Sequence, residues 1–248
     1  TVDGGPAAAW ADAAVARLRA MPDVTLLPRT TAFGYQDHDL VTLLERRGDH
    51  RRPAEAPVFR ERLWKVRAKA VVLATGAHER PLVFARNDLP GVMLAGAVAT
   101  YVRRYAVLPG RDAVVFTNND AGYEAAIALR GAGASVRVVD ARARPDGALT
   151  ENARSLGVPI TSGSVVFEAR GGKRVAGVRV AAIDARGELS GATSELACDL
   201  LAVSGGMSPV VHLHAQAGSK ARWDDARAAF VPGAPAQSER SAGGCNGT

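Results

Sequence analysis

The sequence predicts an α/β fold, and three observations support this class. Alanine, valine and glycine dominate the composition and only 5% of the residues are aromatic, which favours close-packed α/β layers over an aromatic-rich β-sandwich. The apolar run Ala70–Ala74 is too short for a helix and is β-branched in its middle, so we expect a parallel strand that is buried on both sides. Residues 112–140 then have the spacing of a βαβ unit.

The first part of the chain predicts one helix and a small meander. Ala7–Ala20 has helical propensity, with apolar residues four positions apart. A short strand is expected at Val24–Leu27. Strands at Thr31–Tyr35 and Leu40–Arg46 form an antiparallel meander, with residues 37–39 as its turn. Asp49–Pro57 then forms a polar, charged loop.

The next segment leads from a strand pair to a predicted boundary. Glu61–Arg67 and Lys69–Leu73 are expected to pair and to enter a turn at Thr75-Gly76. A small residue followed by glycine lets backbone N–H groups approach a ligand, and ligands of open α/β sheets lie at the carboxyl ends of strands. Ala95–Arg104 is predicted to be a helix, and residues 108–110 (Leu-Pro-Gly) form a turn at a domain boundary.

A second α/β unit follows this boundary. Asp112–Thr117 and Ser135–Asp140 are predicted strands on either side of a helix at Asp120–Gly131. Further strands are expected at Val158–Ile160, Ser164–Ala169, Val175–Ala182 and Leu196–Val203, three of them in a hairpin-rich insertion. Residues 200–209 repeat the pattern of an apolar strand that runs into a glycine turn.

Composition limits the class of protein. With 248 residues and 47% hydrophobic content, the chain can bury a sizeable core. It contains no run of 18 apolar residues, so no membrane span is expected. It shows no signal peptide, so the cytoplasm is the expected location. Cys198 and Cys245 form no CxxC pair, which excludes a thioredoxin-type redox pair and a cysteine zinc site.

The net charge of +6 does not predict nucleic-acid binding. Arginines are scattered along the chain, without interleaved aromatic residues or a DNA-binding motif. The densest cluster, in residues 46–62, lies in a proline-containing loop. We interpret this cluster as a solvated loop or a surface that faces another subunit.

Several strings along most of the chain carry a family resemblance. They are LPRTTAFGY at 27–35, LWKVRA at 63–68, GAHERPLVF at 76–84, NDLPGVML at 87–94, VFTNND at 115–120 and VVDAR at 138–142. These strings resemble the α subunits of heterotetrameric sarcosine oxidases. Thioredoxin-reductase-like flavoproteins and the larger subunits of opine and amino-acid dehydrogenases belong to the same superfamily.

The resemblance implies an FAD/NAD(P)-binding Rossmann-like fold with two dinucleotide-binding domains, incomplete at both ends. Residues 1–108 would be the second half of the first domain, without its N-terminal βαβ unit and GxGxxG motif. Residues 109–215 would be an inserted second Rossmann-like domain, and residues 216–248 would begin the return into the first domain. We therefore expect an internal fragment of a longer subunit.

The resemblance also implies a cofactor site. It places a dinucleotide, NAD in this subunit, against Ala74, Thr75 and Gly76, with Gly243 and Gly244 as the opposing wall. Many relatives carry an acid where this chain has Gly244, which weakens a flavin interpretation and is compatible with NAD. FAD and FMN are expected in the complete complex.

The inserted βαβ unit departs from the dinucleotide-binding pattern. Its strand-to-helix turn reads TNNDAG at 117–122, where a GxGxxG motif needs glycine next to the pyrophosphate. Asp120 is expected at or near the helix N-cap, where its carboxylate would repel a phosphate. Asp140 stands where a ribose-binding acid would be. The turn is either a structural cap at a degenerate nucleotide site or a site that still binds a ligand.

Other titratable residues give weaker signals. His78, Glu79 and Arg80 form either an acid–base cluster or a domain-linking loop held by charge pairing. His212 and His214 are two positions apart on an expected loop, without an evident third metal ligand, so no metal site is predicted.

By resemblance, the whole enzyme oxidises an N-methyl amino acid, a small amine substrate, to formaldehyde and glycine, with oxygen as acceptor. The chain would contribute NAD or FAD binding and scaffolding for β-, γ- and δ-type subunits, with no catalytic residue of its own. Three alternatives stay open: the large subunit of an opine- or proline-type amino-acid dehydrogenase, an NAD(P)H:flavin reductase, and a non-catalytic interaction subunit with a degenerate nucleotide site. The turn at 118–120 and the missing CxxC argue against the reductase.

Overall fold

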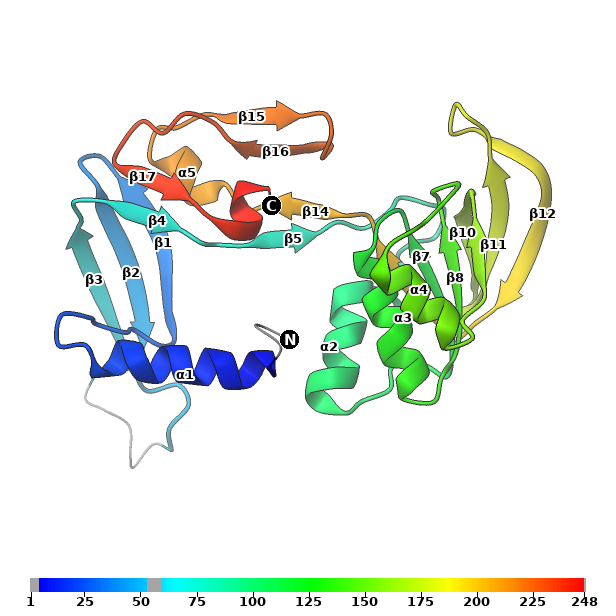
Figure 1. Ribbon diagram of the computed structural model, residues 1–248, viewed down its shortest axis with the longest axis horizontal. Coiled ribbons are helices and arrows are strands. Elements are labelled where there is room, and N and C mark those ends of the chain that lie inside the picture. Colours follow the sequence, from blue (N-terminus) through cyan, green and yellow to red (C-terminus); the bar gives the residue numbers. More distant parts are fainter. Residues whose placement is uncertain (1–4, 53–58, 248) are drawn as a thin grey trace. The chain divides into compact units, whose positions relative to one another are not determined.

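The computed structural model describes residues 5–52 and 59–247. These residues form two compact units, which Figure 1 shows in the colours of the sequence. Unit 1 contains the described residues up to 75 together with 210–246, and unit 2 contains residues 76–209 and Gly247. The chain therefore passes between the units at 75/76 and again at 209/210.

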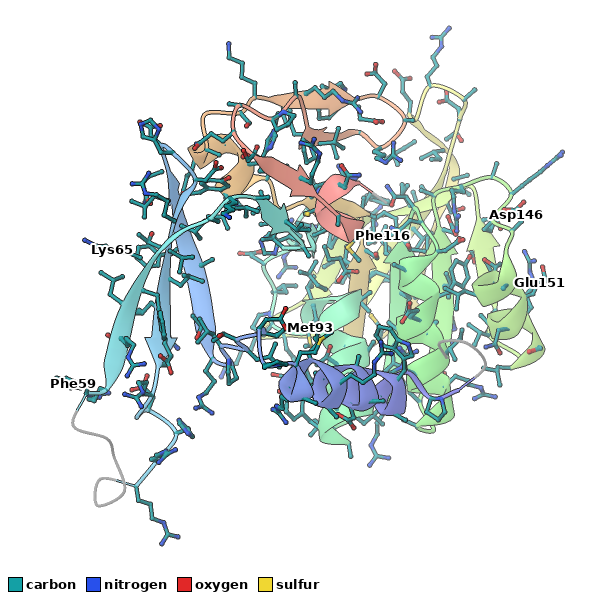
Figure 2. All side chains as sticks on the ribbon, turned by 60° about the vertical axis from the view of Figure 1, so that its left-hand side comes forward. Phe59, Lys65, Met93, Phe116, Asp146 and Glu151 are labelled. Atoms are coloured by element: carbon teal, nitrogen blue, oxygen red, sulfur yellow. The ribbon has the colours of Figure 1, made fainter. Side chains whose placement is uncertain are left out.

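The first part of unit 1 is a helix followed by an antiparallel meander. Helix α1 (Ala7–Ala20) has the predicted bounds, and it buries none of its residues within the described chain. Strands β1 (Thr30–Gln36), β2 (Leu40–Arg46) and β3 (Glu61–Arg67) pair in the order β1-β2-β3, which confirms the meander. Lys65, labelled on β3 in Figure 2, is exposed.

Two predictions in this region have other outcomes. The strand predicted at Val24–Leu27 is wrong, because this segment is irregular and pairs with none of the described strands. The loop predicted at Asp49–Pro57 lies partly outside the described residues, and its described part, residues 49–52, is irregular, with a turn at 49–50 and a bend at 51. The turn at residues 37–39 is confirmed, with His38 at φ 62° and Asp39 at φ 53°, a conformation that these residue types adopt more readily than most.

The rest of unit 1 is built around a pair of parallel strands. Strand β4 (Val71–Leu73) pairs with β17 (Glu239–Ser241), and not with β3 as predicted. Two-sided burial of this strand is also wrong, because β4 pairs with one described strand only and Val72 is 69% exposed. The unit also contains α5 (His212–Gln216), the hairpin β15 (Ala221–Asp224) and β16 (Ala229–Pro232), and the 3-10 helix η2 (Gly243–Asn246).

The core of unit 1 joins these elements. One cluster of buried apolar side chains comes from β1, β4, α5 with the residue after it, and η2, and its members are Tyr35, Leu73, Leu213, Ala217 and Cys245. Helix α5 packs on β1, and the Cys245 thiol donates a hydrogen bond to Leu73 O at the end of β4. The return segment 210–246 therefore contacts both the meander and the parallel strands.

Unit 2 is organised around a parallel sheet in the order β6-β13-β7-β8-β9. The strands of this sheet are β6 (Val92–Leu94), β7 (Asp112–Thr117), β8 (Ser135–Asp140), β9 (Ile160–Ser162) and β13 (Leu200–Ser204). Helices α2 (Ala95–Tyr105), α3 (Ala121–Gly131) and α4 (Ala148–Ser155) belong to the same unit (Figure 1). The α/β fold class is thereby confirmed.

Alternation along the parallel strands explains the layers of unit 2. Ala113 and Val115 of β7 pack in the cluster that holds the helices, whereas Val114 and Phe116 pack in a second cluster. That second cluster contains residues of an antiparallel sheet, β10 (Ser164–Gly171), β11 (Val175–Ile183) and β12 (Leu189–Ala197). Because successive side chains of a strand point to opposite faces, both faces of β7 are covered. Phe116 is labelled in Figure 2.

The predicted elements of unit 2 are confirmed with local differences. The hairpin-rich insertion is the sheet β10-β11-β12. The single strand predicted at Leu196–Val203 is two strands, because Cys198 and Asp199 separate β12 from β13. The strand predicted at Val158–Ile160 begins only at Ile160. Helix α4, which contains Glu151 and follows Asp146 (both labelled in Figure 2), was not predicted.

Unit 2 also contains a short antiparallel ribbon of β5 (Ala77–Glu79) and β14 (Met207–Pro209). Backbone hydrogen bonds extend it, from Arg80 N to Gly206 O at 2.8 Å and from Gly205 N to Arg80 O at 2.7 Å. A Cβ at Gly205 would lie 2.9 Å from the carbonyl oxygens of Arg80 and Pro81, so the close approach of these two backbone segments requires glycine at position 205.

The unit limits differ from the predicted domain limits. Residues 76–108 lie in unit 2, because β6 pairs with β13 and α2 packs against α3. Residues 210–215 lie in unit 1, where α5 packs on β1. The division at 108/109 and 215/216, which describes segments of a longer family fold, stays a prediction.

Candidate functional site

The strongest candidate site begins where β4 and β17 end. The two strands are parallel and in register, with Ser241 opposite Leu73. Parallel strands end at the same edge of their sheet, so residues 74–75 and 242–244 leave side by side; we call these segments the paired turns. The structure therefore brings the predicted residues Ala74 and Thr75 to the same edge as Gly243 and Gly244.

Hydrogen bonds fix the backbone of the paired turns. The amide of Ala242 donates to Leu73 O at 2.9 Å, and the Thr75 hydroxyl donates to Val210 O at 2.9 Å. The thiol of Cys245, which is 1% exposed, donates to the same Leu73 carbonyl at 2.9 Å. The second turn is thus held to the end of β4 from two positions, while Gly243 itself stays exposed.

Two glycines beside these strand ends have the left-handed backbone that favours glycine. Gly243 has φ +67°, and Gly76, the first residue of unit 2, has φ +73°. A Cβ at either position would meet no described atom within 4 Å. Open space beside a backbone that lacks a side chain is what a closely approaching ligand requires.

The turn between β7 and α3 in unit 2 is filled by its own side chains. The Thr117 hydroxyl donates to Asn119 O at 2.8 Å and accepts from Asn119 N at 3.1 Å. The Asn119 amide nitrogen donates to Ser204 O at 3.1 Å. A Cβ at Gly122 would lie 2.5 Å from Thr117 Oγ1, so this glycine serves close packing of helix on strand.

The cap of α3 differs from the prediction. Asp120 stands at the helix N-cap position, but its carboxylate makes no capping hydrogen bond. The side chain of Asn119 instead accepts from the amide of Ala121 at 2.9 Å. The Asp120 carboxylate accepts from Arg142 Nη1 at 2.7 Å, because the guanidinium offers a charged donor that a backbone amide does not.

Asp140 lies at the end of β8 and is fully buried. It accepts hydrogen bonds from the Tyr123 hydroxyl at 2.8 Å, from Arg142 N at 2.9 Å and from Arg142 Nη2 at 2.8 Å. Burial and the hydrogen bond to Asp140 raise the pKa of the Tyr123 phenol above its ordinary value. The hydrogen bond with Asp140 also raises the pKa of Arg142.

Arg142 therefore bridges the two acids of this turn, Asp120 and Asp140. A ribose hydroxyl at Asp140 would need an oxygen that this chain already uses, and a pyrophosphate at the turn would meet the Asp120 carboxylate. Sequence reasoning identified both acids but not Arg142. Its signal in the sequence is its spacing, two residues after Asp140, which places the guanidinium within reach of that carboxylate.

The segment His78–Arg80 forms strand β5 and the residue after it, not a loop. Glu79 Oε2 accepts from the amide of Gly96 at 2.7 Å, in the first turn of α2. Arg80 joins the ribbon with its backbone. Glu79 thus supports the start of α2, since a carboxylate there meets free amide groups and a favourable helix dipole.

His212 and His214 lie on helix α5, which corrects the predicted loop. His214 is buried in unit 1. Among the described residues, no group of three or more His, Cys, Asp or Glu side chains could hold a metal ion. In the same part of the chain, no helix has the length and apolar character of a membrane span.

Both cysteines are free thiols and both are buried. Burial raises the pKa of the Cys198 thiol to about 11, with a smaller contribution from the nearby Asp199 charge. The thiol proton is therefore lost more easily from the unfolded chain than from the folded one. The contribution of Cys198 to the free energy of unfolding is therefore fully present below a pH of about 9, where the thiol is protonated in both states. It is lost as the pH rises toward 11.

We expect Cys198 to be nearly inert in the native protein. The thiolate is the nucleophile. A pKa about two units above that of a free thiol lowers the fraction present as thiolate about a hundredfold at pH 8. Alkylation by iodoacetamide at pH 8, followed for the Cys198 peptide by mass spectrometry, should therefore be at least about a hundredfold slower than in denaturant. Equal rates in the two states would contradict the buried placement of this thiol.

The family follows from comparison with known proteins. A family model described as pyridine nucleotide-disulphide oxidoreductase matches residues 4–228. The chain belongs to this family. Its fold is accordingly the FAD/NAD(P)-binding Rossmann-like fold, as predicted.

Two curated relatives confirm the resemblance noted in the sequence. Sarcosine oxidase subunit alpha of Corynebacterium sp. (strain P-1) is 45% identical over 248 residues, which cover 99% of this chain and 26% of the relative. The protein of the same name from Rhizobium meliloti (strain 1021) is 39% identical over 249 residues, covering 100% of this chain and 24% of the relative. The chain spans about a quarter of the length of the curated relatives it matches.

Solved structures show the same fold. Thioredoxin reductase from T. acidophilum has a TM-score of 0.57 at 18% identity, covering 73% of this chain and 59% of that one. L-proline dehydrogenase from P. horikoshii has a TM-score of 0.54 at 22% identity, covering 87% of this chain and 36% of that one. The oxidoreductase fold is thus shared with proteins of different named activities.

Proposed function

We propose that this chain is the dinucleotide-binding part of the α subunit of a sarcosine-oxidase-like amine oxidoreductase. The observation that carries the proposal is the parallel register of β4 and β17, which brings the paired turns to one edge. Family membership and two relatives named as sarcosine oxidase subunit alpha support it.

The proposed contacts are Ala74, Thr75, Gly76, Gly243 and Gly244. The residues fit a dinucleotide, because Gly76 and Gly243 offer backbone beside open space and no carboxylate stands at 74–76 or 242–244. Backbone amides there would donate to the pyrophosphate. When bound, NAD supplies a hydride acceptor. No catalytic residue is assigned to this chain, whose part is to bind and orient the dinucleotide.

Unit 2 is proposed to serve as scaffold and not as a second dinucleotide site. Its turn at 117–120 is occupied by internal hydrogen bonds, and Arg142 forms ion pairs with both acids within the chain. A ligand phosphate would have to displace Asp120 from Arg142. This argues for one dinucleotide per chain, and it argues against an NAD(P)H:flavin reductase, which needs one site for the flavin and a second for the nicotinamide dinucleotide.

The complete enzyme would oxidise an N-methyl amino acid such as sarcosine to glycine and formaldehyde, reducing oxygen to hydrogen peroxide and consuming water. FAD and FMN would belong to the complete complex, in which β-, γ- and δ-type subunits are the expected partners. The flavin that oxidises the amine is expected on the β-type subunit and at its interface with the α subunit.

Release of bound nucleotide tests the proposal. The intact complex is purified, denatured by heat, and the supernatant is analysed by chromatography and mass spectrometry. We expect NAD in a fixed ratio to this subunit, in addition to any flavin. A complex that turns over sarcosine but releases no NAD and no dinucleotide assignable to this subunit would contradict the proposed site.

Two other functions give different outcomes in the same preparation. Dye-dependent formation of a keto acid, without oxygen-dependent release of formaldehyde, would indicate the large subunit of an opine- or proline-type dehydrogenase. The closed turn of unit 2 favours a further candidate, a non-catalytic interaction subunit. Complete absence of dinucleotide, with an assembled complex, would support that candidate.

A further inference from the structure

Three polar side chains are buried together in unit 1, outside the paired turns. Glu239 is 1% exposed, His214 is 2% exposed and Ser219 is 6% exposed. They come from β17, from α5 and from the segment between α5 and β15, drawn in orange and red in Figure 1. None of them belongs to the proposed dinucleotide contacts.

Hydrogen bonds and one close approach join the members of this cluster. The Ser219 hydroxyl accepts from the amide of Ala236 at 2.8 Å, and it donates to Glu239 Oε1 at 2.6 Å. His214 Nε2 accepts from the amide of Gly233 at 3.2 Å. His214 Nδ1 lies 2.8 Å from Glu239 Oε1, although it makes no hydrogen bond with a described residue. Both side chains therefore converge on one carboxylate oxygen.

The other oxygen of Glu239 has a different environment. Oε2 is buried and accepts no hydrogen bond from the described residues. A buried carboxylate is costly unless its oxygens are satisfied, and an apolar residue of similar volume would fill such a place at lower cost. From β1, Tyr35 lies within electrostatic range of Glu239, and its pKa is raised by burial and by the hydrogen bond to Asp39.

Glu239 is connected directly to the second of the paired turns. It is the first residue of β17 and lies opposite Val71, two positions before the pairing of Ser241 with Leu73. Leu73 O then accepts from Ala242 N and from the Cys245 thiol, each at 2.9 Å. A displacement of Glu239 would thus shift the register that sets the backbone of residues 242–244.

The residues before Glu239 are held as well. Asp39 Oδ1 accepts from the amide of Ser238 at 3.1 Å, and Gln237 Oε1 accepts from the amide of Asp39 at 2.7 Å. These contacts hold the two residues that precede β17. The buried cluster holds the side chain of Glu239, the first residue of the strand. Both sets of contacts therefore determine the position of the turn 242–244.

We infer that His214, Ser219 and Glu239 are positioning residues for the turn 242–244. The inference rests on the proposed function for the identity of the ligand, since it is the dinucleotide that the turn would contact. The positioning itself is a property of the turn, and it can be measured without any nucleotide.

Cys245 provides the measurement. Its thiol is 1% exposed and is held to Leu73 O, so it reacts only when the turn opens. Cys198, buried in unit 2, serves as the internal reference. The intact subunit is treated with iodoacetamide, and the labelling rates of the two peptides are followed by mass spectrometry. NAD affinity is measured on the same samples by titration calorimetry.

We expect Glu239→Ala to raise the labelling rate of Cys245 by at least about tenfold, because the buried Ser219 hydroxyl loses its acceptor and His214 loses the carboxylate 2.8 Å from its Nδ1. Cys198 should change by less than about twofold, as sites in separate units behave independently. Glu239→Gln keeps an acceptor oxygen for the Ser219 hydroxyl and a polar side chain of the same size beside His214, and it should restore most of the protection. Ser219→Ala removes one donor and should give an intermediate rate. Glu195→Ala, at an exposed position on β12, is the matched control and should change neither rate.

Each outcome has a definite meaning. An unchanged Cys245 rate in Glu239→Ala overturns the inference, because the cluster then does not position the turn. An equal increase at Cys198 overturns it as well, because the substitution then destabilises the whole fold and not the turn alone. Failure of Glu239→Gln to protect Cys245 overturns it too. If the wild-type subunit binds no NAD, the proposed function fails, but the labelling rates still decide whether the cluster positions the turn. Selective exposure of Cys245 together with weaker NAD binding supports both.

Discussion

Replacing Arg142 by alanine is expected to lower the free energy of unfolding by about 3 kcal/mol. Asp140 is fully buried and receives three of its hydrogen bonds from the Arg142 side chain, besides those from Tyr123 and the Arg142 backbone. Removal of the guanidinium leaves a buried carboxylate without its counter-ion, which is the costly way to break such a pair. Denaturant unfolding followed by circular dichroism measures the change.

Two further variants isolate the cause. The double variant Asp140→Asn/Arg142→Ala should be more stable than Arg142→Ala alone, because the uncompensated charge is gone. Arg144→Ala, two residues along at an exposed position, should change stability by less than about 0.5 kcal/mol. If Arg142→Ala unfolds like Arg144→Ala, the bridge between Asp120 and Asp140 has no stabilising role and does not close unit 2 to a nucleotide.

The parts of the fold that could be predicted are those determined by local pattern. Strands β2, β3, β7 and β8 and helix α1 have the predicted bounds. In each case, consecutive residues carry the signal, either as an apolar run, as alternation or as helical spacing. The hairpin-rich insertion was predictable for the same reason, since its turns at 171–172 and 184–187 are marked by glycine.

Pairing between distant segments could not be predicted in this way. The apolar run at 70–74 indicates a strand, but nothing in it names β17 as its partner instead of the neighbouring β3. Burial depends on such partners, so the prediction that β4 is covered on both sides failed with the pairing. The family resemblance, not the residue pattern, placed Gly243 and Gly244 opposite Thr75.

Side-chain networks were also beyond the sequence. Asp120 and Asn119 are both good capping residues, and the choice between them is made by Arg142, which takes the Asp120 carboxylate. The sequence predicts a loop at His212 and His214. His214 is nevertheless buried, because α5 packs on β1 and Glu239 lies beside the His214 side chain. In both cases the deciding partner is far away in the sequence.

The turns that follow β7 and β17 thus have opposite properties. The turn after β7 carries side chains with hydrogen-bonding groups, and it satisfies them internally. The turn after β17 carries glycines and leaves its backbone open. A ligand that needs close backbone contact is therefore expected at the second kind of turn, and a substitution that adds only a methyl group is the sharpest test of this expectation.

Replacing Gly243 by alanine is expected to weaken NAD binding by at least about tenfold while the fold is retained. The added Cβ meets no described atom within 4 Å, so it clashes with nothing in the chain itself. It instead fills the space through which the dinucleotide would reach the backbone. The left-handed φ of +67° adds a strain of about 1–2 kcal/mol. Titration calorimetry on nucleotide-stripped protein measures the affinity, and denaturant unfolding measures the strain.

Gly157 supplies the matched control for that strain. It lies in unit 2 with φ +71°, and a Cβ there would also meet no described atom within 4 Å. Gly157→Ala should therefore lose stability to a similar extent as Gly243→Ala but keep its affinity for NAD. Equal affinities in the two variants would mean that the turn 242–244 does not contact the dinucleotide. Weaker binding in Gly243→Ala alone would separate a ligand contact from a general effect of backbone strain, because the two substitutions impose the same conformational cost.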